Sequence, residues 1–273
     1  MIIDGHAHQG GEYEDLDTIL ATLDIAGVDK VVLTPPGSRG QKSMALPEIG
    51  SKIPGSGLNF AVNRLIRATT AKKSNWDYIE KGNEDVFEIA NRSGGRVMQF
   101  LWVNPLKENV VEEAAEKFEL WKYKGIKLHQ GCHPFEIKSS YFNDLAEFAA
   151  TKGIPLFIHL YSRKEVLDFI SISSSYNTIF ILGHLIGLDL FIEYKEKTGE
   201  NIFFDISCPS LVSAERISLA VQAFGAEKIV MGSDTPYGKN NIGKMISRLG
   251  SLNLSNRDRE LISGGNLKRI LNI

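Results

Sequence analysis

Met1-Ile2-Ile3-Asp4-Gly5-His6-Ala7-His8 opens the sequence with an apolar run that ends in two histidines. Alternate side chains of an extended strand point to the same face, so His6 and His8 are predicted to lie side by side. Two imidazoles at this separation can bind one divalent ion, although such a pair is more often a solvated strand face. The rest of the sequence has to decide between these two interpretations.

The pattern of this first segment recurs along the chain, where short β-branched runs alternate with amphipathic helical segments. Eight segments are predicted to be strands: residues 2–8, 29–34, 96–103, 125–129, 154–160, 178–184, 201–207 and 228–234. Between them, apolar residues recur at the spacing of one buried helix face, as in Leu145, Ala146 and Ala149. Eight strand and helix units in 273 residues predict a single domain, residues 1–273, folded as a (β/α)8 TIM barrel.

One segment is longer than a minimal barrel needs. Residues 35–81 follow the second strand and contain Pro35-Pro36-Gly37, a loop-like stretch at 47–57 and a helical stretch at 60–71. We interpret 35–81 as an insertion over the strand ends, where it would serve as a substrate lid or as a contact in a homo-oligomer. A loop without a role in catalysis is the alternative.

Composition argues against several classes of protein. The formal net charge is -2, so no overall field attracts nucleic acid. No run approaches the roughly 18 to 20 apolar residues of a membrane span, and the first residues lack the pattern of a secretory signal. Cys132 and Cys208 are too few for a disulfide framework, so we expect reduced thiols and a cytoplasmic protein.

Functional side chains of a (β/α)8 barrel stand at the carboxyl ends of its strands. Polar residues close five of the predicted strands here: His6 and His8 on the first, Lys127 and His129 on the fourth, His159 on the fifth, His184 on the sixth and Asp234 on the eighth. A single histidine after an apolar run is usually a satisfied core residue. Their recurrence at equivalent positions of different units predicts a shared site.

The residue types fit a metal centre. Zinc accepts imidazole nitrogen and carboxylate oxygen, and a catalytic zinc site leaves one position open for water. Four residues would suffice as the protein ligands of one ion: His6, His8, His159 and Asp234. Such an ion lowers the pKa of its bound water to around 7, so Asp234 could accept the proton while His184 orients or protonates the substrate.

Six motifs run from one end of the chain to the other: Ile3-Asp4-Gly5-His6-Ala7-His8, Gly125-Ile126-Lys127-Leu128-His129, Pro155-Leu156-Phe157-Ile158-His159, Gly183-His184, Gly232-Ser233-Asp234-Thr235-Pro236 and Gly265-Asn266-Leu267-Lys268-Arg269-Ile270-Leu271. Together they resemble the amidohydrolase superfamily, and within it the amidohydrolase-related (amidohydrolase 2) family of metal-dependent hydrolases. The resemblance implies one divalent ion held by the four ligands named above, with His184 at the catalytic position. The family includes hydrolases of C–N, C–O and C–C bonds as well as decarboxylases, so it does not name the substrate.

Several further residues are candidates for the site. Lys127 lies near the place where other branches of the superfamily carry a carboxylated lysine that bridges two metals, so a second ion is an alternative to an ordinary lysine paired with an acidic group. His129 and Arg163 are expected to bind substrate, the arginine through a carboxylate or phosphate; a polar barrel rim and a solvated helix start are the simpler interpretations. Asp4 and Asp205 are candidates for orienting ligands or the catalytic group.

We therefore predict a metal-dependent hydrolase that acts on a small carboxylated or cyclic molecule through a metal-activated water. A metal-dependent decarboxylase of an unsaturated or aromatic carboxylate is the first alternative. A TatD-like phosphodiesterase acting on DNA is the second alternative, suggested by Asp234-Thr235-Pro236-Tyr237. Against it, this chain has Lys127 on the fourth strand, at the position where the TatD-like group has a glutamate ligand. A non-catalytic barrel with a structural metal is the third.

Overall fold

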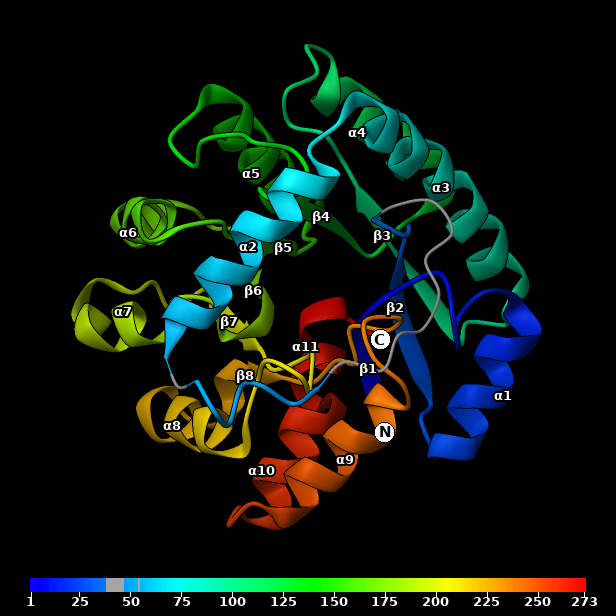
Figure 1. Ribbon diagram of the computed structural model, residues 1–273. Coiled ribbons are helices and arrows are strands. Elements are labelled where there is room, and N and C mark those ends of the chain that lie inside the picture. The colour runs from blue at the N-terminus through cyan, green and yellow to red at the C-terminus, as the bar shows by residue number, and fades with distance from the viewer. Residues whose placement is uncertain (38–46, 54) are drawn as a thin grey trace.

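Eight parallel strands form a barrel in the computed structural model, which describes residues 1–37, 47–53 and 55–273 (Figure 1). The strands follow one another in sequence order: β1 Ile3–His8, β2 Lys30–Thr34, β3 Val97–Trp102, β4 Gly125–His129, β5 Leu156–His159, β6 Phe180–Leu182, β7 Ile202–Asp205 and β8 Ile229–Val230. The backbone N–H of Gly5 donates to Met231 O at 2.9 Å and so joins β1 to the end of β8. The predicted (β/α)8 barrel and its eight strands are confirmed, with shorter bounds for most strands.

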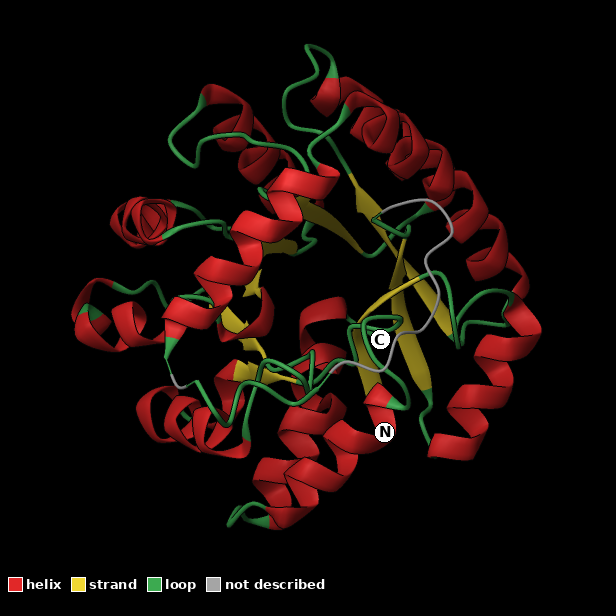
Figure 2. Ribbon diagram, in the orientation of Figure 1, coloured by secondary structure: helices red, strands yellow, loops and turns green. Residues whose placement is uncertain are grey.

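Helices surround the strands, as Figure 2 shows. They are α1 Leu16–Ala26, α3 Lys73–Arg92, α4 Val110–Trp121, α5 Ser140–Lys152, α6 Arg163–Ile172, α7 Leu188–Glu193, α8 Ala214–Phe224, α9 Asn241–Ser251, α10 Asn256–Glu260 and α11 Asn266–Leu271. Local sequence sets their ends. Helix α1 begins after Asp15, whose side chain accepts from Thr18 N at 2.9 Å, and it ends at Gly27, which takes the left-handed conformation with φ 66°.

Among the described residues, two large apolar clusters and one small cluster of Ile79, Trp102 and Cys132 are buried in the barrel. The largest cluster lies between the strands and the surrounding helices. The second cluster fills the barrel interior with inward-pointing residues that include Phe100, Phe157 and Phe203, together with Leu267 of α11. This interior is a packed core and not a pore, so the polar site lies above it, at the carboxyl end of the strands.

The expected insertion at 35–81 has a defined structure over the part that is described. It contains α2 Ser56–Thr70, which begins four residues earlier than the predicted helical stretch, and the first turns of α3. Helix α3 packs against β2 and β3 as a barrel helix, whereas α2 crosses the mouth of the barrel above β4, β5 and β6 (Figure 1). Residues 38–46 and 54 of the predicted insertion lie outside the described residues.

None of the helices described is both long enough and apolar enough to cross a membrane.

Candidate metal centre and active site

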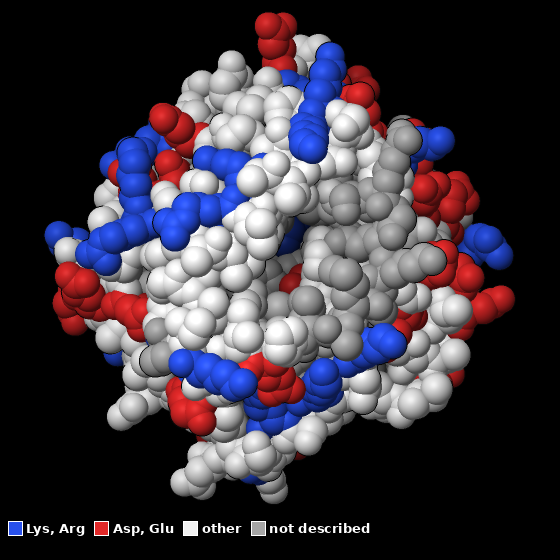
Figure 3. Space-filling view, in the orientation of Figure 1, with Lys and Arg blue, Asp and Glu red and all other residues white. Residues whose placement is uncertain are grey.

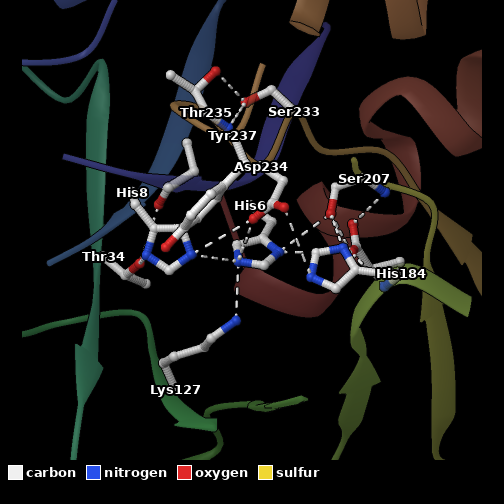
Figure 4. A network of polar contacts seen from close by, with 12 residues as sticks. His6, His8, Thr34, Lys127, His184, Ser207, Ser233, Asp234, Thr235 and Tyr237 are labelled. Carbon is white, nitrogen blue, oxygen red and sulfur yellow. Dashed lines mark hydrogen bonds and ion pairs between the residues drawn. The ribbon is translucent and has the colours of Figure 1, made fainter. Parts of the chain in front are cut away.

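Three predicted ligands meet at the mouth of the barrel (Figure 4). His6 and His8 project from the same face of β1, and their Nε2 atoms lie 3.3 Å apart. Asp234 Oδ1, in the segment after β8, lies 3.7 Å from His6 Nε2 and 3.6 Å from His8 Nε2. All three side chains are buried, and their ligand atoms lie within 4.8 Å of one another.

These separations fit one divalent ion. Two nitrogens that each lie about 2.0–2.1 Å from a tetrahedral zinc are about 3.3 Å apart, which matches the distance between His6 Nε2 and His8 Nε2. Two imidazoles and a carboxylate are also donors that zinc and similar ions accept. The donor set therefore fits the divalent metal ion that the sequence predicts.

Hydrogen bonds on the far side of the imidazole ring orient His8. Its Nδ1 lies 2.8 Å from Pro35 O and 2.9 Å from Thr34 Oγ1. A carbonyl oxygen only accepts, so the Nδ1–H donates to Pro35 and the lone pair of Nε2 faces His6 and Asp234. This tautomer is the one that binds a metal through Nε2.

Asp4 holds the first and last strands in the register that the site needs. Its Oδ1 accepts from Ser233 N at 2.7 Å, and its Oδ2 accepts from Tyr13 Oη at 2.9 Å. The neighbouring Asp234 N donates to His6 O at 2.7 Å. The orienting role expected for Asp4 thus has a geometric basis, because Asp4 binds the segment that carries Asp234.

His184 lies on the other side of Asp234. Its Nε2 is 4.0 Å from Asp234 Oδ2, and its Nδ1 is 3.0 Å from Ser207 Oγ. Its backbone N–H donates to Asp205 Oδ2 at 3.1 Å, and Asp205 also accepts from the Ser207 hydroxyl. Asp205 therefore positions His184 through Ser207, which ends a predicted strand and could have been noticed by that position.

The backbones of His184 and Asp234 are both left-handed, with φ 56° and 58°. Non-glycine residues at such angles cost free energy, and they persist where surrounding contacts hold them, often in active sites. Here the backbone N–H of each residue is held by a hydrogen bond, to Asp205 Oδ2 and to His6 O respectively. The two candidate catalytic residues thus share an unusual conformation that strand patterns do not predict.

His159 and His129 form a stacked pair at the ends of β5 and β4. Their ring centroids lie 3.9 Å apart, and the ring of His159 also meets His184 edge-on at 5.0 Å. His159 Nε2 lies 2.7 Å from Asn63 Oδ1, while His129 Nδ1 accepts from Gly131 N at 3.0 Å. His159 lines the same cavity as His8 and Asp234 but is not part of the tight three-residue group, so its role as a ligand stays a prediction.

Lys127 is completely buried beside the candidate metal ligands. Its Nζ lies 2.9 Å from His6 Nε2 and 3.9 Å from the centre of the Phe157 ring. Burial lowers its pKa to about 7, and the carboxylates of Asp234 and Asp205 oppose that shift. Within the described part of the chain no carboxylate forms an ion pair with Lys127, so the expected acidic partner is replaced by a histidine.

Burial dominates the proton affinities of the site. It lowers the pKa of His8 to about 3 and that of His184 to about 4, and it raises the pKa of Asp234 to about 7 against the opposing charge of Lys127. The histidines are therefore neutral near pH 7, which is the form that binds metal. Asp234 can take up or release a proton in the same range.

A cavity of about 370 Å³ lies above these residues, and the space-filling view is hollowed at this place (Figure 3). Its walls include Trp102, His129 and Tyr237, and its roof comes from one face of α2, including Val62 and Ile66. Arg163 is exposed at the first residue of α6 and does not line this cavity. Its predicted contact with substrate stays a prediction.

Sequence patterns did not single out the residues of α2 that reach the site. Asn59, Asn63 and Arg67 recur every four residues, and this polar stripe inside an otherwise ordinary helix is the signal that could have been noticed. Trp102 was placed in a strand but not in the site, because an aromatic residue at a strand end is usually core.

Comparison with protein families gives one match to this chain. The family described as Amidohydrolase matches residues 3–273. No curated protein matches.

Solved structures of similar fold include three enzymes. A 5-carboxyvanillate decarboxylase from Novosphingobium aromaticivorans, complexed with manganese and 4-hydroxy-3-methoxy-5-nitrobenzoic acid, is 12% identical with a TM-score of 0.71, covering 100% of this chain and 96% of that one. A 2,6-dihydroxybenzoate decarboxylase from Rhizobium is 13% identical with a TM-score of 0.70, covering 99% and 98%. A probable 2-pyrone-4,6-dicarboxylic acid hydrolase from Acinetobacter baumannii is 12% identical with a TM-score of 0.67, covering 100% and 99%. At these identities the likeness shows the shared fold.

Proposed function

The chain belongs to the amidohydrolase family and is a metal-dependent enzyme, and on that premise we propose that it hydrolyses a small carboxylated or cyclic molecule. The observation that carries the proposal is the buried group of His6, His8 and Asp234, whose ligand atoms have the separations of a single divalent-ion site. His159 is proposed as the fourth ligand. A bound divalent ion supplies Lewis-acid polarisation of a substrate oxygen and makes water a stronger acid.

We propose one ion and expect zinc, because three imidazoles and one carboxylate form a nitrogen-rich donor set. Manganese is the alternative, since a solved structure of the same fold contains it. A second ion bridged by a carboxylated Lys127 is a further alternative. Metal analysis of the purified protein, with the number of ions per chain, distinguishes these three possibilities.

Asp234 and His184 are proposed to transfer the protons of the hydrolysis reaction. Asp234 directs Oδ1 toward His6 and His8 and Oδ2 toward His184, so one carboxylate can face the ion and the catalytic histidine together. Asp234 Oδ2, the oxygen turned away from His6 and His8, is proposed to accept a proton from water. In the metal-free protein burial raises the pKa of Asp234 to about 7. Ser207 donates its hydroxyl to Asp205 and so accepts from Nδ1–H of neutral His184, which leaves a lone pair on Nε2. His184 can take the proton from Asp234 at Nε2 and pass it to the leaving group, so that both residues return to their starting states.

The cavity supports a small substrate. Its volume of about 370 Å³ lies in the range of small-molecule sites, and Trp102, Tyr237 and the apolar face of α2 favour a flat or cyclic body. His129 lies in the cavity wall and is proposed to contact substrate, as is Arg163 from the neighbouring rim. We propose no nucleic acid as substrate.

A decarboxylase is the second candidate. The same carboxylate and histidine could deliver a proton to the carbon that loses carbon dioxide. An apolar cavity favours that reaction, because a carboxylate that moves out of water loses its solvation before it leaves as neutral carbon dioxide.

One experiment tests the function and separates the two reactions. The metal-loaded protein is incubated in ¹⁸O-labelled water with lactones, amides and aromatic carboxylates, and products are examined for ¹⁸O and for released carbon dioxide. Hydrolysis gives labelled product without carbon dioxide, and decarboxylation gives the reverse. A folded protein that retains no divalent ion after purification and dialysis against zinc or manganese contradicts both.

We also propose that the protein is cytoplasmic, because both cysteines are free thiols, as expected of a reducing compartment. A homo-oligomer formed through residues 35–81 is the alternative to a monomer, and light scattering distinguishes them.

A further inference from the structure

Helix α2 binds the ends of three neighbouring strands through one polar stripe. Its three members donate to backbone carbonyls just past those ends: Asn59 to His184 at 3.0 Å, Asn63 to Leu160 and Tyr161 at 2.8 Å each, and Arg67 to Gln130 at 2.7 Å. These carbonyls follow β6, β5 and β4. His159 and His129 are the last residues of β5 and β4, and His184 lies two residues after β6. The helix is therefore fixed above those histidines as well as above the cavity (Figure 1).

Asn63 makes one contact that the other two residues of the stripe do not make. Its two backbone partners, Leu160 O and Tyr161 O, can only accept, so the amide NH2 of Asn63 must face them. The amide oxygen consequently faces the imidazole of His159, with Oδ1 2.7 Å from Nε2. Because this oxygen is an acceptor only, the proton of a neutral His159 must lie on Nε2.

We propose that Asn63 is a positioning residue that fixes His159 in the tautomer protonated at Nε2 and thereby offers the lone pair of Nδ1 to the divalent ion. The inference rests on the proposed metal site, and it extends that site to the inserted helix. His8 shows the opposite arrangement, in which Nδ1–H donates to Pro35 O and Nε2 is offered. Ligands of a metal are commonly oriented by such outer contacts.

The proposal gives α2 two connected roles. Val62 and Ile66 of this helix form part of the cavity roof, while Asn63 lies between them in sequence and is buried against His159. Displacement of α2 would therefore open the cavity and release the imidazole of His159 in the same movement. The insertion is then a part of the metal centre as well as a cover for it.

The first test reads the tautomer directly. Nitrogen NMR of the metal-free protein labelled with ¹⁵N-histidine distinguishes a protonated from an unprotonated ring nitrogen, and the signals of His159 are assigned by their loss in His159→Gln. We expect wild-type His159 to carry its proton on Nε2, and Asn63→Leu to give a mixture of tautomers or protonation at Nδ1. A wild-type His159 protonated at Nδ1 overturns the proposal without any variant having to fold.

The second test measures metal affinity by competition with a chromophoric chelator, using Zn²⁺ and Mn²⁺. Asn63→Leu should bind about 10- to 100-fold more weakly, as is typical when an outer contact of a ligand is lost. Asn63→Asp keeps an acceptor for Nε2–H but loses the NH2 donor to Leu160 O and Tyr161 O, so it should restore only part of the affinity. Asn59→Leu is the matched control, because it removes a carbonyl contact one turn away without touching an imidazole, and it should bind like wild type.

The outcomes separate this inference from the function on which it rests. Equal affinity of Asn63→Leu and wild type, or an equal loss in Asn59→Leu and Asn63→Leu, overturns the special role of Asn63. A wild-type protein that binds neither ion overturns the metal site, while the tautomer of His159 in the metal-free protein still decides whether Asn63 fixes the ring.

Discussion

The Nζ of Lys127 lies 2.9 Å from Nε2 of His6, the atom that His6 offers to the proposed ion. A lysine and a metal ion are thus directed at the same lone pair. The lysine reaches it from β4, at the bottom of the site, and the packed ring of Phe157 keeps its ammonium group out of water. Its charge and the charge of the ion must therefore influence one another.

We predict that Lys127→Met binds zinc more tightly. Removal of a nearby positive charge should strengthen binding about tenfold near pH 7, which corresponds to about 1.4 kcal/mol. Chelator competition at pH 7 measures the change. If Lys127 is instead carboxylated and bridges two ions, the variant will lose one ion per chain, and the metal count will contradict the single-ion site.

Metal binding should stabilise the folded protein. An ion at about 100 times its dissociation constant stabilises by about 2.7 kcal/mol, which for a chain of this size should raise the melting temperature by about 5–10 °C. Thermal melts with and without zinc measure the shift. His8→Asn should abolish it, and an undiminished shift in that variant would place the ion elsewhere.

The metal-free protein should lose stability in mild acid, and His133 provides a clean measure of that loss. Burial lowers the pKa of His133 from 6.5 to about 3, and neither ring nitrogen has a hydrogen-bond partner among the described residues. The unfolded chain therefore binds a proton that the native protein excludes, so this contribution to stability is complete above pH 6.5 and declines as the pH falls toward 3.

His133→Phe removes the imidazole that binds this proton in the unfolded chain. The free energy of unfolding should then depend less steeply on pH, by about 1.4 kcal/mol per pH unit between about pH 6 and pH 4. Urea titrations of the metal-free proteins across this range give the slope. Identical slopes for wild type and variant would mean that His133 takes up its proton in the native state.

At Gly5, where β1 closes the barrel against the end of β8, we expect no larger residue to be tolerated. A Cβ there would lie 2.3 Å from Leu267 Cδ1 and 2.7 Å from the backbone oxygen of Met231. The leucine can move, but the backbone that closes β1 on β8 cannot, so Gly5→Ala should destabilise by about 1–3 kcal/mol. It should also weaken metal binding, because His6 is the next residue.

Gly57→Ala is the matched control for Gly5→Ala. Gly57 is exposed in α2, and a Cβ there would meet no atom of the described residues within 4 Å. The substitution should stabilise by about 0.5–1 kcal/mol through helix propensity. Chemical denaturation measures the free energy of unfolding of both variants. An unchanged free energy of unfolding in Gly5→Ala would show that the ends of β1 and β8 can separate without loss of stability.

The sequence by itself determined the architecture and the residue types of the centre. Short β-branched runs and helical stripes are local properties, so they predicted eight strands, their order and the polar residues at their carboxyl ends. The spacing of His6 and His8 needed only the geometry of one strand to place both imidazoles on one face.

Tertiary structure alone decided which of those residues touch one another. Asn63 and His159 are 96 positions apart, and Lys127 and His6 are 121 apart, so no local period relates the members of either pair. Their distances follow from the way the barrel closes and from the path of α2 over its mouth. The left-handed backbones of His184 and Asp234 are likewise held by contacts with distant strands, and for that reason they were invisible in the sequence.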